Sequence, residues 1–152
     1  MKFSGQEWAL LQALQSNAAL SLAELAEVAG VGTSTAWRKV QEFEAAGIIR
    51  GRVALLDPAR TGAGLCIFAT VRLSDHSEAT IAAFSRVIRS HPEIMEAHSI
   101  SGTSDYMLKI RCADVAAYEA FMTHNLLRND TVKSVESSFS LKELKYTTAL
   151  PL

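Results

Sequence analysis

The spacing of apolar residues changes once along this chain, and the change divides it into two parts of different architecture. Before residue 57, apolar residues recur every three or four positions, the period of α-helices that pack on a core. After residue 64, segments with the two-residue period of strands alternate with segments of helical period. Asp57, Pro58, Gly62 and Gly64 interrupt both periods. We therefore expect a first domain at residues 1–57, a linker at 58–64 and a second domain at 65–152.

The first domain is predicted to hold three short helices. Ser4 with Glu7 and Ser21 with Glu24 have the spacing of a capping box, in which a serine hydroxyl and a glutamate carboxylate satisfy backbone N–H groups at a helix start. The third helix is expected to end near Gly47. The residues expected on the inner faces of the helices are Trp8, Leu11 and Leu14, then Leu22, Leu25, Ala26 and Ala29, then Ala36, Val40 and Phe43.

The junction between the second and third helices is typical of a helix-turn-helix. Ala26 permits close approach of the helices, and Gly30 admits the backbone conformation that reverses the chain. Val31 and Ala36 fill the gap between the two helices. A hydroxyl among residues 33–35 is expected to cap the third helix. In this motif the start of the second helix lies in the major groove of DNA.

Polar residues on the third helix, and shortly after it, are the candidate DNA contacts. Hydroxyls bond phosphates or base edges, an arginine fork fits guanine or phosphate, and lysine offers a point charge. Trp37 lies among them and is expected to pack on the core of the domain instead. The predicted DNA-binding residues are Thr33, Ser34, Thr35, Arg38, Lys39, Arg50 and Arg52.

Arg50 and Arg52 lie in a predicted wing. Residues 48–56 consist of two apolar, β-prone runs around a turn at Gly51, which indicates a hairpin. The chain carries 15 Lys and Arg against 16 Asp and Glu, a formal net charge of −1, so a basic surface requires local arrangement. We expect the cations to gather on one side of the domain and these carboxylates to lie elsewhere: Glu24, Glu27, Glu42 and Glu44.

The second domain is predicted to have a ferredoxin-like α+β fold. Its expected elements are a strand at 65–73, a helix at 78–89, strands at 94–101 and 106–112, a helix after Asp114 and a strand at 132–141. This βαββαβ order forms an α/β sandwich with one four-stranded antiparallel sheet and both helices on one face. Phe68 and Met107 are expected on the other face, where a second subunit would shield them from water, so at least a dimer is predicted.

The turn at residues 102–106 is the candidate site for a small molecule. Backbone amides at Gly102 and the Thr103 hydroxyl would donate hydrogen bonds to a carboxylate, Asp105 would bind an ammonium group, and Tyr106 would line a side-chain pocket. Such a set suits a zwitterion. The alternative is a plain hairpin turn in which Asp105 bonds its own backbone.

The chain resembles the Lrp/AsnC family of feast-or-famine regulators from about Trp8 to Tyr146. The likeness rests on the order of LAEVAGV at 25–31, RKV at 38–40, GIIRG at 47–51, EAHSISG at 96–102 and DYMLK at 105–109. It implies a winged helix-turn-helix joined to the family's amino-acid-metabolism regulation (RAM-type) domain. It also implies DNA binding as a dimer, frequent assembly into octamers, and an amino-acid effector held between subunits near the 102–106 turn.

The expected function is that of a sequence-specific, DNA-binding transcriptional regulator that responds to an amino acid or a related metabolite. Its expected partners are double-stranded DNA, further copies of itself and that effector, with no other cofactor and no membrane. One alternative is an enzyme like the sirohaem decarboxylases, which look like the same two-domain arrangement. Another is an adaptor that only oligomerises.

Catalysis and metal binding find little support in the residues. No catalytic motif or metal-ligand spacing joins the scattered histidines His76, His91, His98 and His124. Cys66 and Cys112 lie in apolar, strand-like runs and are expected to be reduced core residues. The first residues lack the pattern of a secretory signal and no apolar run reaches the length of a membrane span, so a cytoplasmic protein is expected.

Overall fold

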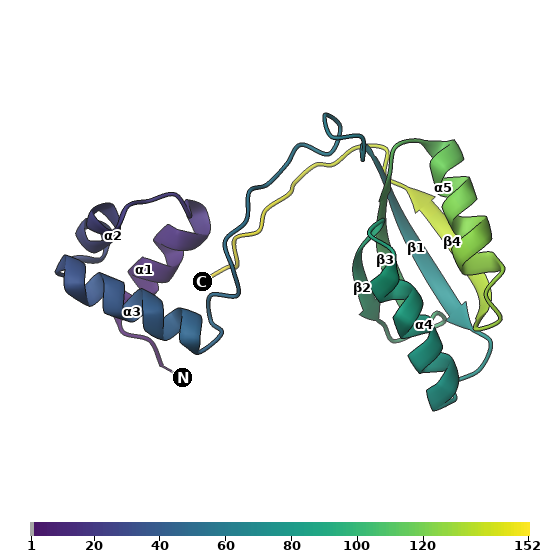
Figure 1. Cartoon of the computed structure of the whole chain (residues 1–152), viewed down its shortest axis with the longest axis horizontal. Coiled ribbons are helices and arrows are strands. Elements are labelled where there is room, and N and C mark those ends of the chain that lie inside the picture. The colour runs from purple at the N-terminus through teal and green to yellow at the C-terminus, as the bar shows by residue number, and fades with distance from the viewer. Residues whose placement is uncertain (1) are drawn as a thin grey trace. The chain divides into compact units, whose positions relative to one another are not determined.

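The computed structural model describes residues 2–152, which form two compact units (Figure 1). The first unit contains the residues up to Leu55 together with Leu144–Leu152, and the second contains Leu56–Glu143. The sequence places residues 144–152 in the second domain, whereas their contacts group them with the first unit. None of the helices within residues 2–152 is both long and apolar enough to cross a membrane.

Three helices build the first unit: α1 (Gly5–Ser16), α2 (Leu22–Ala29) and α3 (Thr33–Ala45). Both predicted capping boxes are confirmed, with the hydroxyls of Ser4 and Ser21 accepting from the N–H groups of Glu7 and Glu24. Gly30 ends α2 in the left-handed conformation at φ 63°, as the reversal of the chain requires. The helix-turn-helix predicted from the small residues of this region is therefore present.

A single apolar core holds these helices together. The inner faces predicted for α2 and α3 are largely confirmed, and Ala36 has no exposed surface at all. The prediction for Trp8 is wrong, because its side chain is 37% exposed while Leu10 takes the buried position at 1%. The Trp8 ring lies at the rim of the core and packs edge-on against Phe3, with ring centroids 4.8 Å apart.

The hairpin predicted at residues 48–56 is wrong. Gly47 at φ 69° turns the chain after α3, and the N–H groups of Ile48 and Ile49 both donate to the Phe43 carbonyl. These two isoleucines pack on the helical core instead of starting a strand. Residues 51–57 form neither strand nor helix, and their apolar side chains remain largely exposed. Among residues 2–152, the sheet consists of β-strands that all lie after residue 64, and residues 51–57 are not part of it.

Residues 144–152 complete the first unit against α1. Leu150 N–H donates to Gln15 Oε1 at 2.9 Å, and Gln15 Nε2 donates to the Leu150 carbonyl at 3.0 Å. Gln12 Nε2 also donates to the Leu152 carbonyl, at 3.3 Å. The Gln15 amide therefore pairs with one residue of extended backbone much as a neighbouring strand would.

The second unit is the predicted ferredoxin-like fold. Its elements are β1 (Leu65–Leu73), α4 (Glu78–Ser90), β2 (Ile94–Ser99), β3 (Tyr106–Cys112), α5 (Val115–Phe121), a π-helical stretch η1 (Met122–Leu127) and β4 (Val132–Phe139). The sheet order is β2-β3-β1-β4, and all neighbouring strands are antiparallel. Asp114 caps α5 by accepting from Ala117 N–H at 2.8 Å, as predicted.

Both helices cover the same face of the sheet (Figure 1). Phe84 of α4 and Tyr118 of α5 share a core with the inward residues of β1, of which Ile67, Ala69 and Val71 have no exposed surface. Cys66 and Cys112 are buried thiols, as expected. The sheet's other face, which we call the open face, carries Phe68 and Met107 with 41% and 38% of their surface exposed. These two residues lie where the sequence predicted them.

Candidate nucleic-acid interface and small-molecule hollow

The exposed side of α3 carries the first group of predicted site residues. Because Ala36, Val40 and Phe43 face the core, the residues on the far side of the helix point into solvent. Thr33, Ser34, Thr35 and Arg38 are exposed, and Lys39 is half-buried. The predicted hydroxyl cap is wrong: the N-cap is Gly32, which supplies no side-chain hydrogen bond, and the hydroxyls of residues 33–35 lie within the helix. The first turn of α3 therefore presents three hydroxyls to solvent.

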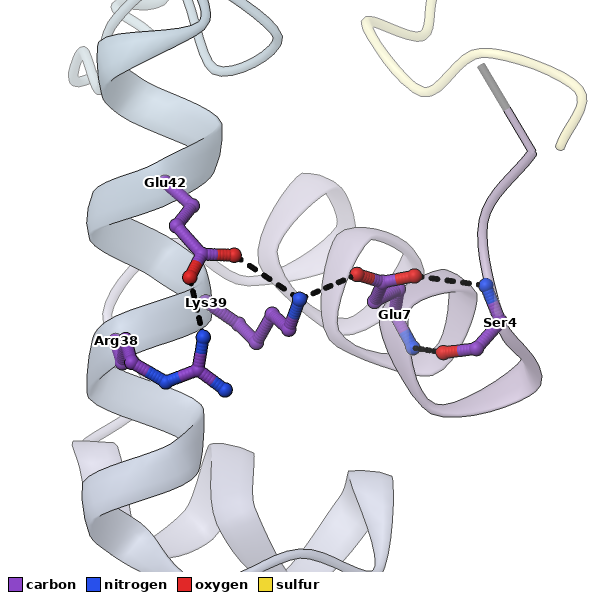
Figure 2. A network of polar contacts seen from close by, with 5 residues as sticks. All are labelled: Ser4, Glu7, Arg38, Lys39 and Glu42. Atoms are coloured by element: carbon purple, nitrogen blue, oxygen red, sulfur yellow. Dashed lines mark hydrogen bonds and ion pairs between the residues drawn. The ribbon is translucent and has the colours of Figure 1, made fainter.

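Ion pairs hold the two basic residues of α3 (Figure 2). The Arg38 guanidinium contacts the Glu42 carboxylate. Lys39 Nζ lies 2.8 Å from Glu7 Oε1 and 3.0 Å from Glu42 Oε2, so it bridges α1 and its own helix. The other oxygen of Glu7 accepts from Ser4 N–H at 2.8 Å. One carboxylate thus caps α1 and also fixes Lys39.

The expectation that the carboxylates lie away from these cations is wrong for two of the four, Glu42 and Glu44. Glu42 pairs with both Arg38 and Lys39, and Glu44 lies 2.8 Å from Arg52. The i,i+4 and i,i+3 spacings within α3 place Glu42 beside its partners on the helix surface. Arg50 makes no recorded ion pair with any residue of 2–152. The predicted DNA-binding cations are therefore largely neutralised in the free protein.

These ion pairs keep their charges at neutral pH. The pKa of Glu7 falls to about 2, chiefly through its hydrogen bond with Lys39 and next through the Ser4 backbone. Lys39 has a raised pKa because it bonds Glu7 and Glu42, and the pKa of Glu42 is lowered chiefly by Lys39. The Arg38–Glu42 pair is weak in water, because about half of each side chain is exposed. The Lys39–Glu7 pair is less exposed.

The turn at residues 102–106 holds the second group of predicted site residues. Gly102 takes φ 116°, and the carbonyl of Thr103 accepts from Arg72 Nε. Asp105 Oδ2 accepts from Leu73 N–H at 2.8 Å, and its Oδ1 lies 2.8 Å from His76 Nε2. These contacts, His76 first, lower the pKa of Asp105. Asp105 therefore bonds the end of β1 and the segment after it, and not its own backbone.

Tyr106 ends this turn and, like Ser104 and Asp105, is more buried than Gly102 and Thr103. It is the first residue of β3, it is half-buried, and its ring centroid lies 5.0 Å from that of Phe84. It therefore borders the core of the second unit.

A hollow of about 290 Å³ lies where the turn meets the open face. Of the predicted effector residues, it includes Thr103 but not Gly102, Asp105 or Tyr106. Its lining residues are Thr70, Arg72, Thr103, Ser104, Ser134 and Glu136. Four of these come from β1 and β4, where Thr70 pairs with Glu136 and Arg72 with Ser134. Sequence reasoning missed these four, although Thr70 and Arg72 alternate with buried residues in β1 and so mark polar positions on the open face.

The hollow brings opposite charges together across two strands. Its lining combines Arg72 from β1 and Glu136 from β4 with four hydroxyl side chains. Such a lining suits a small molecule that carries both a carboxylate and an ammonium group. Within residues 2–152 no group of three or more His, Cys, Asp or Glu side chains is arranged to hold a metal ion.

Comparison with family models matches both units. The model described as "Lrp/AsnC ligand binding domain" matches residues 66–150, and the model described as "Winged helix-turn-helix DNA-binding" matches residues 4–50. The glutamate uptake regulatory protein of Zymomonas mobilis is 34% identical over 143 residues, covering 94% of this chain and 87% of the relative. The DNA-binding transcriptional activator DecR of Escherichia coli is also 34% identical over 143 residues, covering 94% of each chain.

Solved structures resemble the chain over nearly its whole length. An AsnC family transcriptional regulator from Agrobacterium tumefaciens superposes with a TM-score of 0.92 at 36% identity, covering 98% of this chain and 97% of the other. A transcriptional regulator from Neisseria meningitidis in complex with L-Met gives a TM-score of 0.94 at 33% identity, covering 99% and 97%. These relatives are named as regulators, which does not favour the decarboxylase alternative.

The Glu7 carboxylate is expected to make the stability of the helical unit depend on pH. Because its pKa is lowered, its contribution is complete above the ordinary value of 4.5 and disappears as the pH falls to about 2. Glu7→Gln keeps a side-chain acceptor for Ser4 N–H but removes the charge. We expect it to destabilise the unit at neutral pH, and the difference from wild type to vanish near pH 2.

Urea unfolding followed by tryptophan fluorescence measures this effect, because Trp8 and Trp37 both belong to the first unit. Glu27→Gln on α2 is the matched control, since Glu27 makes no recorded ion pair within residues 2–152. An effect of Glu7→Gln that stayed constant from pH 7 to pH 2 would contradict the assignment.

Proposed function

This chain belongs to the Lrp/AsnC family of transcriptional regulators, and from that premise we propose that α3 contacts promoter DNA while the second unit binds an amino-acid effector. The observation that carries the DNA half is the exposed side of α3, with its three hydroxyls and two cations, in a helix-turn-helix that a DNA-binding family model matches. Catalysis forms no part of the proposal. The protein works in the cytoplasm, where it meets DNA.

The hydroxyls and cations of the first unit have different proposed roles in DNA binding. Ser34 and Arg38 project from the most exposed side of α3 and face base edges in the major groove. Thr33 and Thr35 flank them and bond phosphates. Lys39, Arg50 and Arg52 supply charge to the DNA backbone. The seven residues predicted from the sequence thus form one proposed interface.

Arg38→Ala is expected to weaken binding to a promoter fragment roughly tenfold, because it removes a bidentate contact. The dependence of log affinity on log salt concentration should also become shallower by about 1 if the contact is to a phosphate. A gel-shift series at several salt concentrations measures both, with oligomer size checked by light scattering. Arg60→Ala is the control, because Arg60 lies outside the helices and is highly exposed. Unchanged binding by Arg38→Ala would remove α3 from the interface.

Glu42→Gln is expected to act in the opposite direction. Glu42 pairs with two proposed DNA contacts, so DNA must displace its carboxylate and tolerate its negative charge. Neutralising it should raise the affinity for DNA of unrelated sequence severalfold at low salt, with a smaller effect at high salt. Glu27→Gln, on α2, makes the same charge change outside the ion-pair network. If Glu42→Gln bound no better than Glu27→Gln, the pairs would not compete with DNA.

The second unit is proposed to bind an amino acid at the hollow and the adjoining turn. In this proposal Arg72 and Thr103 bind the carboxylate, and Glu136 or the ionised Asp105 binds the ammonium group. Tyr106 and the Gly102 backbone belong to the adjoining turn. The L-Met bound by the Neisseria meningitidis regulator supports an effector of this class. Phe68 and Met107 on the open face support assembly into at least a dimer, and the family resemblance extends this to octamers.

A thermal-shift and calorimetry screen of the standard amino acids is expected to identify at least one ligand. Arg72→Ala should weaken its binding more than tenfold by removing the carboxylate partner. Arg89→Ala is the matched control, because Arg89 is exposed on α4, which covers the other face of the sheet. A screen with no binding and no change in oligomer size would overturn the effector proposal and leave the DNA proposal intact.

A further inference from the structure

The indole of Trp37 belongs neither to the proposed DNA contacts nor to the proposed effector site. The sequence predicted that it packs on the core, and this is wrong, because 56% of its surface is exposed. The buried side of α3 is centred near Ala36, and one residue advances about 100° around a helix. Trp37 therefore lies on a flank of the helix. Among the described residues of α3, it is the one large apolar side chain left exposed.

Trp37 forms one wall of an open hollow of about 410 Å³. Leu22, the first residue of α2, forms another wall, and Thr33 and Ser34 complete the lining. The surface of the hollow is mostly apolar, with two hydroxyl groups at its edge. Thr33 and Ser34 precede Trp37 by four and three residues, so all three lie on neighbouring positions of the same helix face.

This hollow adjoins the proposed DNA contacts. Ser34 lines the hollow and also lies one turn before Arg38, the residue proposed to meet a base edge. When α3 enters a major groove, the hollow enters with it. The C5-methyl group of thymine is the apolar group that base pairs present in that groove, and apolar side chains recognise it by contact. The occupant that fits both the position and the chemistry is a thymine methyl.

We propose that Trp37 and Leu22 receive the methyl group of a thymine, which makes Trp37 a specificity-determining residue for DNA. The proposal rests on the proposed function, since it requires α3 in the major groove. The methyl group loses contact with water against the indole and the leucine side chain. Burying a group of this size corresponds to roughly a fourfold gain in affinity. The carbonyl and ring nitrogens of the base contribute nothing to this difference.

The test compares thymine with deoxyuridine, which lacks only the methyl group. Sites are first selected from a random DNA library with the full-length wild-type chain, and each thymine is then replaced singly. We expect wild type to bind roughly fourfold more weakly when one particular thymine of a half-site is replaced. Trp37→Ala should bind the two DNAs equally. Arg38→Ala should bind both more weakly and keep the fourfold ratio.

A second measurement follows the indole itself. In the Trp8→Phe background Trp37 is the remaining tryptophan, so its emission reports on its own surroundings. Binding of the selected DNA should shift the emission to shorter wavelength, and the deoxyuridine DNA should shift it less. Trp37→Phe, which keeps an aromatic ring, should retain part of the discrimination and guards against a folding defect in Trp37→Ala.

The possible failures are distinct. If wild type selects no DNA sequence, the proposed function fails. If it selects a sequence but no thymine replacement matters, or Trp37→Ala keeps the same ratio, the role of Trp37 is overturned. An emission shift that depends on protein concentration without DNA would show that a second copy of the chain occupies the hollow, and would overturn the role as well.

Discussion

The close contact at Ala36 fixes the geometry on which the whole first unit depends. Its methyl group is completely buried in a core to which α2 contributes two equally small residues, Ala26 and Ala29. Helices that meet through residues of this size lie close together, and a larger side chain at any of these positions would force them apart. Because α3 is held along this one line, the direction of every other side chain on it follows from the helical period. The hydroxyls, the arginine and the exposed indole are all placed by that contact.

The ion pairs within the first unit reduce the part that net charge plays in the recognition of DNA. Arg38, Lys39 and Arg52 each lie against a carboxylate, so the free protein attracts DNA from a distance less than its count of cations suggests. Contacts that depend on shape and on individual base edges then carry a larger share of the discrimination. A hydroxyl-lined, apolar hollow beside a tethered arginine is suited to that task. The ion pairs thereby favour a site with the right bases over a site with phosphates alone.

Much of this architecture follows from local sequence rules. The bounds of β1, the two capping boxes, the turn at Gly30 and the order of strands and helices along the second unit all come from short-range patterns. The errors have two origins. The partners of Arg38 and the exposure of Trp37 are set by helix geometry rather than by residue type, since i,i+4 spacing and the 100° step locate both. The missing hairpin and the hollow depend on which strands pair and in which register, as with Thr70 and Glu136, and no local pattern determines that.

The hydrogen bonds between Gln15 and Leu150 can form only late in the synthesis of the chain. The two residues are separated by the entire second unit, which a ribosome must synthesise before residue 150 emerges. The helices can form early, because their core lies within the first 55 residues. Their last contacts, however, wait for nearly the whole chain. The helical unit therefore completes its contacts only after the chain of the second unit has been synthesised, and a chain interrupted during translation leaves Gln12 and Gln15 of α1 without these partners.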